Sequence, residues 1–519
     1  MNWLSNTDTI IFDSEFNEEI DINLISGFKN IIFSDYKLYD SLFEYYSNND
    51  FHNLEYKISK LNHGFNMCVP SIRHLNFGNN FNKDVDALPP NLTHLIFGNN
   101  FNKDVSNLPP LLTHLIFKHG FKKDVSDLPH SLTHLTFGYC FNRDVSYLPK
   151  ALIYLTFGDN FNQDVKSLPP SLKHLTFGTC FNKDVSVLPP FLTHITFGLK
   201  FNQDVSKLPL FLTHLTFGKN FNQNIFELPP SLTNLTFGNN FNQDVSNLPT
   251  FITHLTLGYY FNKDVSKLPP NITHLTFADW DDICAPKIPQ ENILSRFGNR
   301  FNQDVSNLPQ TLIYLTFGHY FNQCVLNLPK NIIYLTFGNH FNQCVSNLPQ
   351  TLTHLTFGYT FNKDVSNLPQ TLTHLYFGSS FNQDVISLPP FITHLTFGNN
   401  FNQDISNLPQ TITHLTFGIA FNQDISMLTT NITHLTLGIS YDKPHNIPQN
   451  IKYLKLNCNN SHIINSLPNS VIELELGPNF DMRLDNLPTS IKKIVICEKS
   501  RYDEDLNCLP DFVEELHLN

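Results

Sequence analysis

The chain has 519 residues, with 33 Lys and Arg against 45 Asp and Glu, and a net charge of −12. This acidic balance argues against nucleic acid or an anionic membrane as the main partner. The N-terminus lacks a cationic segment followed by an apolar one, and no apolar run is long enough for a transmembrane helix. Nine cysteines without close pairing fit a reducing compartment. We therefore expect an intracellular, cytoplasmic protein.

Residues 1–80 are expected to form an acidic N-terminal cap built from degenerate repeats. The segment IIFDSEFNEEI from Ile10 lines up with the LTFGNNFNQDV of later repeats, and a second IIF at 31–33 follows 21 residues after the first. Residues 40–64 are the one stretch here without an assignment. A cap is needed because a terminal coil would otherwise expose its apolar core and an open strand edge.

Residues 81–440 read as eighteen blocks of 20 residues, of which the block at 281–300 is degenerate. We number the twenty places of each block from its opening residue. Phe stands at place 1 in all seventeen regular blocks and at place 17 in fifteen of them, so 32 of the 48 Phe residues occupy two places. The excess of Phe is therefore architectural, and the chain must be interpreted as a repeat protein.

Each regular block contains one short strand. Leu92, Leu95 and Phe97 follow an LxxLxF spacing, and Pro89 excludes a helix through this segment. A strand of about five residues with turns on both sides fills a 20-residue coil, and the strands of successive coils would pair in parallel about 4.8 Å apart. The sequence thus predicts a mainly β solenoid with little helix, in which Leu95 and Phe97 point inward and His94 points outward.

Two further places are expected to be structural. Asn at place 2 can satisfy the backbone groups of a turn. Gly at place 18 follows the strand and is expected to adopt a positive φ, which makes Lys118 and Ala278, the exceptions at this place, candidates for strain.

Residues 441–519 are expected to form a C-terminal cap of irregular coils. The segments IKYLKL, VIELEL, IKKIVI and VEELHL each have the apolar spacing of a strand.

The repeated phrase FNQDVSNLPPxLTHLTFG resembles the FNIP repeat, a relative of the leucine-rich repeat known from social amoebae and from large viruses that infect amoebae. The LPxxLxxLxF spacing is also similar to the 20-residue leucine-rich repeats of bacterial effectors. The resemblance implies a curved horseshoe with a parallel sheet and, if the source is viral, a location in the host-cell cytoplasm. Some family members carry an F-box before the repeats, which implies the alternative role of a substrate-recognition component of a ubiquitin ligase, although residues 40–64 leave little room for an F-box.

The middle of the strand, place 14, is His in thirteen regular blocks, Tyr in three and Asn in one. One hypothesis is a metal-binding His ladder, since neutral imidazoles about 5 Å apart could bind a transition metal. We favour an outward, moderately polar face of the sheet, because zinc needs three or four ligands that converge, and a straight row offers at most two.

Place 4 is Asp in fourteen blocks. A calcium-binding Asp ladder would need a nine-residue Gly-rich unit that is absent, so turn capping is the favoured interpretation. GxGxxG, P-loop, HExxH and CxxC motifs are also absent. We therefore expect no enzyme activity, no cofactor and no metal site.

The function predicted from these patterns is a monomeric protein–protein interaction scaffold that presents the strand face to a protein partner of unknown identity. The partner-binding candidates are Trp280, Tyr314, Tyr334, His354 and His374. The degenerate block at 281–300 is interpreted as a decayed coil that kinks the solenoid, with a binding loop as the alternative.

Cys324 and Cys344 occupy the same place in adjacent coils. They are expected to have their Cα atoms within the 4.4–6.8 Å that a disulfide needs, and yet to be free thiols in the cell.

Overall fold

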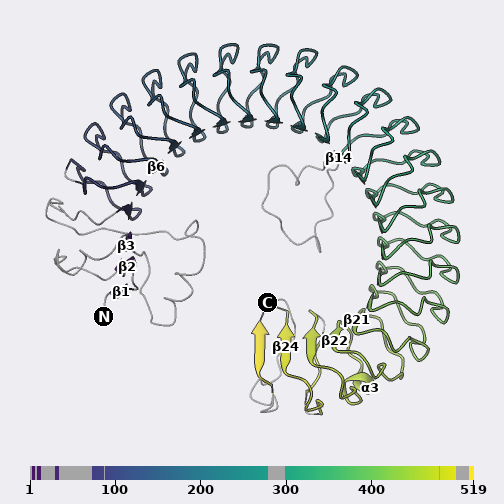
Figure 1. Ribbon diagram of the computed structural model, residues 1–519. Helices are drawn as coiled ribbons and strands as arrows, with labels where there is room; N and C mark the ends of the chain where they lie inside the picture. Colours follow the sequence, from purple (N-terminus) through teal and green to yellow (C-terminus); the bar gives the residue numbers. More distant parts are fainter. Residues whose placement is uncertain are drawn as a thin grey trace. The chain divides into compact units, whose positions relative to one another are not determined.

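The structure is a computed structural model, and it describes residues 3–5, 9–12, 30–33, 73–86, 88–278, 299–478, 480–484, 486–497 and 513–518. The chain divides into two compact units, residues 1–243 with 248–252 and residues 244–247 with 253–519. Each unit is a parallel β-solenoid in which one short strand per coil lines one side of the stack (Figure 1). The predicted fold is thereby confirmed.

The described strands of the first unit are β1 (Trp3–Ser5), β2 (Thr9–Phe12), β3 (Asn30–Phe33), β4 (His74–Asn76), β5 (His94–Phe97), β6 (His114–Phe117), β7 (His134–Thr136), β8 (Tyr154–Thr156), β9 (His174–Thr176), β10 (His194–Thr196), β11 (His214–Thr216) and β12 (Asn234–Thr236). β1 pairs antiparallel with β2, whereas the strands from β2 onward pair in parallel with their neighbours in sequence.

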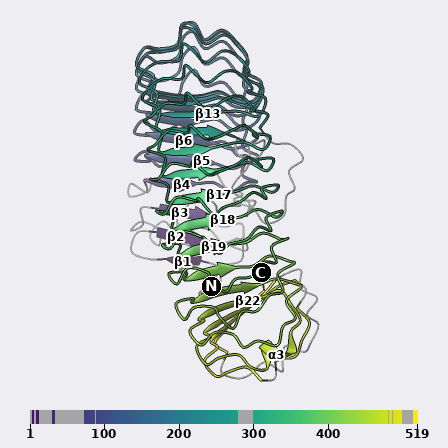
Figure 2. The same ribbon diagram turned by 90° about the vertical axis from the view of Figure 1, so that its right-hand side faces the viewer.

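The described strands of the second unit are β13 (His254–Leu257), β14 (His274–Phe277), β15 (Tyr314–Thr316), β16 (Tyr334–Thr336), β17 (His354–Thr356), β18 (His374–Tyr376), β19 (His394–Thr396), β20 (His414–Thr416), β21 (His434–Leu437), β22 (Tyr453–Leu456), β23 (Glu473–Leu476), β24 (Lys493–Ile496) and β25 (Glu515–Leu518). Figure 2 shows β17, β18 and β19 stacked in order. The described helix α3 (Ser461–Ile464) has four residues, and no described helix is long and apolar enough to cross a membrane.

Strands pair in register, place for place, so that His194 lies opposite His214 and Ile195 opposite Leu215. The strands have three or four residues, fewer than the five expected. The reason is visible in the hydrogen bonds: the N–H groups of Thr113 and His114 both donate to the carbonyl of Thr93, at 2.9 and 3.0 Å, so the regular ladder begins only at place 14.

The coils are closer together on the strand side than on the opposite side. The rings of Tyr314 and Tyr334, at place 14, have centroids 4.4 Å apart, whereas Phe321 and Phe341, at place 1 of the following turns, are 6.1 Å apart. The coils therefore fan out, and within each unit the strands lie on the concave side, as the predicted horseshoe requires (Figure 1).

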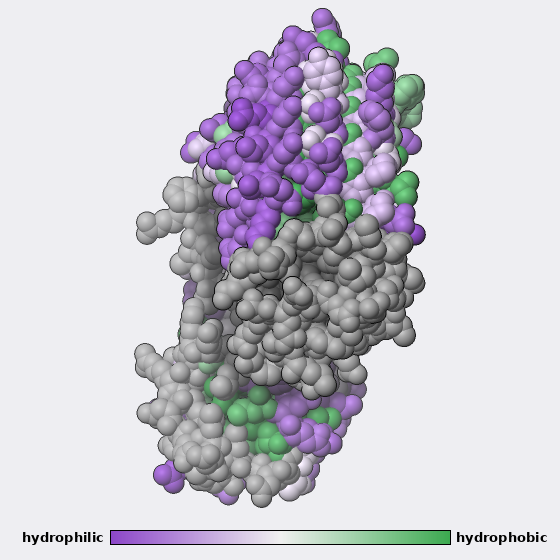
Figure 3. Space-filling model, turned by 90° about the vertical axis from the view of Figure 1, so that its left-hand side faces the viewer, coloured by the Kyte–Doolittle hydropathy of each residue, from purple (hydrophilic) through white to green (hydrophobic). Residues whose placement is uncertain are grey.

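The core is formed by six apolar places of each coil. In one coil these are buried residues Phe101, Val105, Leu108, Leu112, Leu115 and Phe117. The two Phe places interlock, because Phe97 stacks on Phe101 at 3.7 Å and on Phe117, one coil further, at 5.5 Å. On the surface, the same repetition gives rows of similar hydropathy that run from coil to coil (Figure 3). No coil can complete this packing alone.

The Asn at place 2 joins each coil to the next, as expected. Its Oδ1 accepts a hydrogen bond from the backbone N–H at place 2 of the following coil, for example from Asn182 to Asn162 at 2.9 Å and from Asn402 to Asn382 at 2.9 Å. The Gln at place 3 donates to the same oxygen in several coils, as Gln403 does to Asn382 at 3.1 Å.

The expectation of a positive φ for Gly at place 18 is wrong, since no described residue has one. Glycine is required there by close approach: a Cβ on Gly398 would overlap the carbonyl oxygen of Gly378 in the preceding coil. At the exceptions Lys118 and Ala278, the N–H donates to the carbonyl of Phe97 and Leu257, at 3.2 and 2.9 Å. These two coils continue the ladder by one more bond, and neither position is strained in φ.

The strands on the two sides of the degenerate block pair with each other. β14 pairs directly with β15, with His274 opposite Tyr314. Residues 279–298 lie outside the described residues, so their interpretation as a decayed coil stays a prediction. The unassigned stretch 40–64 and the candidate Trp280 lie outside the described residues.

Candidate interaction surface

The residues at place 14 form a continuous row, here called the strand column, on the concave side of each unit. Each side chain is half-buried or exposed between a buried residue at place 12 and another at place 15. The rings stack from coil to coil, for example His354 on His374 at 4.1 Å and 12°. Tyr side chains take part in the same stack, since Tyr154 stacks on His174 at 4.2 Å.

Twelve of the thirteen histidines that regular blocks contribute to the column follow a Thr and use one ring nitrogen within the protein, whereas His174 follows Lys173. The Nδ1 atoms of His114 and His374 lie 2.9 Å from the hydroxyl of the preceding Thr, and that hydroxyl also contacts the carbonyl at place 13 of the coil before. Nε2 is therefore the ring atom that remains for a partner. A Tyr at place 14 offers its hydroxyl instead.

Protonation is disfavoured at eleven imidazoles of the regular blocks. Burial first, and then the like charge of neighbouring imidazoles, lowers the pKa of His94 and His414 from 6.5 to about 4. Burial likewise lowers the pKa of His374 and His394. At neutral pH these imidazoles present a polar but uncharged surface.

The stacked geometry does not support a metal-binding ladder. The rings of His374, His394 and His414 are within 14° of parallel, so their Nε2 lone pairs point side by side and do not converge on one ion. In the part of the chain that the structure describes, no three His, Cys, Asp or Glu residues are grouped to hold a metal ion.

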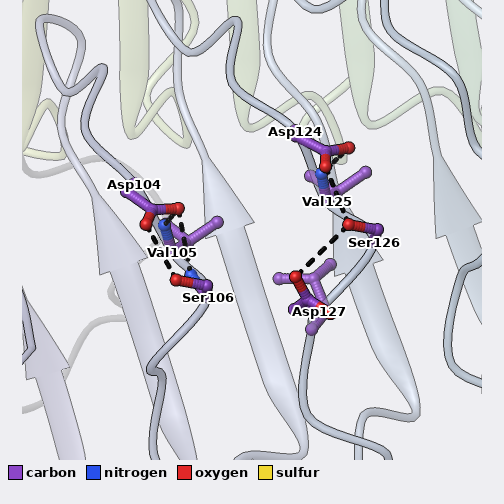
Figure 4. A pocket seen from close by; sticks show the side chains of 8 residues that line it. Asp104, Val105, Ser106, Asp124, Val125, Ser126 and Asp127 are labelled. Carbon is purple, nitrogen blue, oxygen red and sulfur yellow. Dashed lines mark hydrogen bonds between the residues drawn. The ribbon is translucent and has the colours of Figure 1, made fainter.

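The Asp at place 4 caps a turn, as the favoured interpretation had it. Oδ1 of Asp104 accepts from the N–H of Val105 at 2.8 Å, and Oδ2 accepts from the hydroxyl of Ser106 at 2.8 Å (Figure 4). The same bonds recur in later coils and lower the pKa of the carboxyl, as for Asp404, where the hydroxyl of Ser406 is the largest cause. These carboxylates therefore accept hydrogen bonds within their own turn.

The structure brings four of the five predicted site residues together. Tyr314, Tyr334, His354 and His374 stand in the consecutive strands β15, β16, β17 and β18 and stack in sequence at 4.4, 4.4 and 4.1 Å. Their binding role remains a prediction.

A second surface in the same coils was missed by the sequence analysis. Place 20, three residues beyond place 17, holds the exposed residues Tyr260, Arg300, Tyr320 and His340 in the coils around β14–β16, and we call these four the ledge. The Arg300 guanidinium lies 4.8 Å from the Tyr260 ring, and Tyr320 stacks on His340 at 4.8 Å. The available signal was variability, because places 19 and 20 change from coil to coil while their neighbours repeat.

The ledge rests on a buried residue of the neighbouring place. His319 is 8% exposed, lies edge-on to Tyr320 at 4.8 Å, and has its Nδ1 3.0 Å from the side-chain amide nitrogen of Asn339. Burial is the main reason that the pKa of His319 is lowered, so a neutral ring supports the aromatic residues above it.

Comparisons with known proteins agree on one family. The family model described as FNIP Repeat matches residues 84–120, 144–180, 244–279, 321–360, 345–380, 381–419, 421–459, 443–479 and 459–499, together more than half of the chain. No curated protein sequence matches the chain.

Solved structures show the same relationship. CroV588 of a giant virus, described as a novel circular leucine-rich-repeat protein, is 36% identical over 98% of this chain and 78% of its own, with a TM-score of 0.75. The mouse RP105/MD-1 complex (14% identity, 96% of this chain and 87% of that chain, TM-score 0.53) and the TLR13–ssRNA13 complex (15%, 98% and 83%, 0.50) share the fold alone. The chain therefore belongs to the FNIP-repeat family, whose leucine-rich-repeat-like solenoid is a fold typical of protein–protein interaction.

Proposed function

We propose that the protein is a non-enzymatic scaffold that binds a protein partner through the strand column and the ledge of the second unit. The observation that carries this proposal is that two departures from the repeat fall in the same coils: Tyr314 and Tyr334 interrupt the His column in the coils that place Tyr320 and His340 on the ledge. Packing requires neither departure, because both places point away from the core.

The chemistry of these side chains suits a protein surface. Tyr and Arg are enriched at binding hot spots, because they bury a large area and keep a polar end for hydrogen bonds. The rings are already held in stacks, so binding would cost little side-chain entropy. The column is uncharged at neutral pH and the chain is acidic overall, which favours a protein over nucleic acid as the partner.

The test is a double substitution, Tyr314→Asp with Tyr334→Asp, followed by affinity purification from the native host cell. We expect the variant to keep its fold and to lose its co-purifying partners by at least tenfold, since two buried carboxylates would then need solvation in the contact. The matched control is His114→Asp with His134→Asp, which makes the same change in the column of the first unit.

The two variants separate the possible outcomes. Loss of partners with the control alone would keep the column as the binding face but contradict its location at β15 and β16. Retention of partners by both variants would reject the column as the binding surface.

A further inference from the structure

We propose that Cys324 and Cys344 form a dithiol that a peroxide converts into a disulfide across two adjacent coils of the second unit. Both thiols are free and exposed, and they stand at place 4, where fourteen other coils have Asp. The site is independent of the proposed interaction role.

The two coils are held in register on both sides of the cysteines. Before them, the N–H of Asn342 donates to Oδ1 of Asn322 at 2.9 Å. After them, Nδ2 of Asn347 donates to the carbonyl of Leu326 at 2.7 Å. The thiols are therefore presented from equivalent backbone positions that cannot slide past one another.

The spacing on this side of the coil suits a disulfide. Three residues before the cysteines, Phe321 and Phe341 are parallel within 5° and have ring centroids 6.1 Å apart. This ring spacing is close to the usual Cα separation of a disulfide, about 5.5–6 Å, and we infer a similar spacing for the Cα atoms of the two cysteines. On the strand side, where rings are 4.4 Å apart, the same pair would be more crowded.

The two thiols are not equivalent, and Cys344 is the one that reacts first. Its Sγ lies 3.2 Å from the hydroxyl of Ser346, and hydrogen bonds from that hydroxyl and the Ser346 N–H lower the pKa of the Cys344 thiol. At Cys324 the corresponding residue is Leu326, which has no hydroxyl. The thiolate is the nucleophile in such reactions.

The chemistry balances with hydrogen peroxide as the oxidant. The Cys344 thiolate attacks one peroxide oxygen, the O–O bond breaks, and after proton uptake one water leaves, which gives a sulfenic acid. The Cys324 thiolate then attacks the Cys344 sulfur, the S–S bond forms, the S–O bond breaks, and the oxygen leaves as a second water. Two thiols are oxidised and one peroxide is reduced to two waters.

Peptide mapping of the full chain tests the proposal. The reduced protein is treated with equimolar hydrogen peroxide, blocked with N-ethylmaleimide and digested with trypsin, which separates Cys324 on residues 301–330 from Cys344 on residues 331–363. We expect these two peptides to be recovered as one linked species. Cys140 and Cys180 are the internal control, because they occupy one place two coils apart, about twice the reach of a disulfide, and should not link.

Two matched variants test the order of the reaction. Ser346→Ala should slow disulfide formation several-fold, whereas Ser366→Ala, the same change beside Asp364 in the next coil, should leave the rate unchanged. Cys324→Ser should leave a sulfenic acid at Cys344 that dimedone captures.

Three results would overturn the proposal: no linked peptides although Cys344 is oxidised, equal yields of the link in folded and urea-unfolded chains, or an equally abundant link between Cys140 and Cys180.

Discussion

The Asn at place 2 connects neighbouring coils through a single side-chain oxygen, and one coil lacks it. Lys122 donates its own N–H to Oδ1 of Asn102 at 3.0 Å, but it has no side-chain oxygen to accept from Asn142. In the next coil, the N–H of Asn162 donates to Oδ1 of Asn142 at 2.9 Å, which shows the bond that is missing. The break is local, because Nε of Arg143 donates to the backbone carbonyl of Lys122 at 2.8 Å.

Lys122→Asn is therefore expected to stabilise the protein by about 1 kcal/mol, the usual net value of one added hydrogen bond. The urea midpoint measures the effect. Lys123→Asn removes the same charge from the exposed neighbouring place and should have almost no effect. An equal gain from both variants would attribute the effect to charge and not to the Asn oxygen.

Glycine at place 18 is required by space. A Cβ on Gly398 would overlap the Gly378 carbonyl of the preceding coil, so Gly398→Ala must push two coils apart. We expect a loss of roughly 1–3 kcal/mol, as for other overpacked sites, measured by denaturant unfolding. Asn400→Ala, two residues away on the exposed side of the same turn, should cost far less. If Gly398→Ala leaves the free energy of unfolding unchanged, the distance between coils can increase at this place at little cost.

At the scale of the strand, the His column makes stability depend on pH. Because the folded-state pKa of His94 and His414 is lowered from 6.5 to about 4, the unfolded chain binds more protons between these values. Stability is therefore full above pH 6.5 and falls as the pH drops towards 4. We expect a lower urea midpoint at pH 5.0 than at pH 7.5.

A triple variant isolates the contribution of the column. His374→Asn, His394→Asn and His414→Asn use the residue that already occupies place 14 at Asn234. In this variant the urea midpoint should differ less between pH 7.5 and pH 5.0. Its free energy of unfolding at pH 7.5 should stay within about 1 kcal/mol of that of the unchanged protein. If the pH dependence of stability is unchanged in this variant, it arises from other titrating groups.

The strands and the core could be predicted from the sequence because packing repeats with the residues. The inward positions of Leu95 and Phe97, the outward His94 and the capping by Asp104 all follow from spacing and residue type. The role of Gly398 could not be predicted correctly, since close approach and positive φ favour the same residue. The ledge was missed because Tyr260 and Arg300, which are distant in the sequence, are in contact, and no local pattern indicates that contact.

At the scale of the whole molecule, the places of the repeat continue from Ala278 to Asn299 across a gap in the sequence. In the second unit Ala278 stands at place 18, and Asn299 and Arg300 supply places 19 and 20. The Arg300 N–H donates to the carbonyl of Tyr259 at 2.8 Å, the same bond that joins Asn100 to Asn79 in a regular coil. Phe301 then stacks on Phe277 at 3.9 Å, as Phe101 does on Phe97 at 3.7 Å.

Asn299 closes this junction. It is fully buried, its Nδ2 donates to the carbonyl of Gly258 at 2.7 Å and to that of Ala278 at 3.3 Å, and its Oδ1 accepts from the N–H of Phe301 at 2.7 Å. These bonds tie Asn299 to Ala278, the described residue on the other side of segment 279–298, and to the preceding coil. The described strands β14 and β15 pair directly across this junction.

Deletion of residues 279–298 should accordingly leave a protein that unfolds cooperatively and whose free energy of unfolding is unchanged within about 1 kcal/mol. The reason is that Ala278 and Asn299 already occupy consecutive places. The control is a deletion of residues 391–400, half a regular coil, which removes β19 and brings the following Phe residues out of phase with the core. We expect that variant to lose cooperative unfolding. If the deletion of 279–298 is as damaging as the half-coil deletion, the segment supports the array, and the continuity seen at Asn299 is not sufficient to hold the coils together.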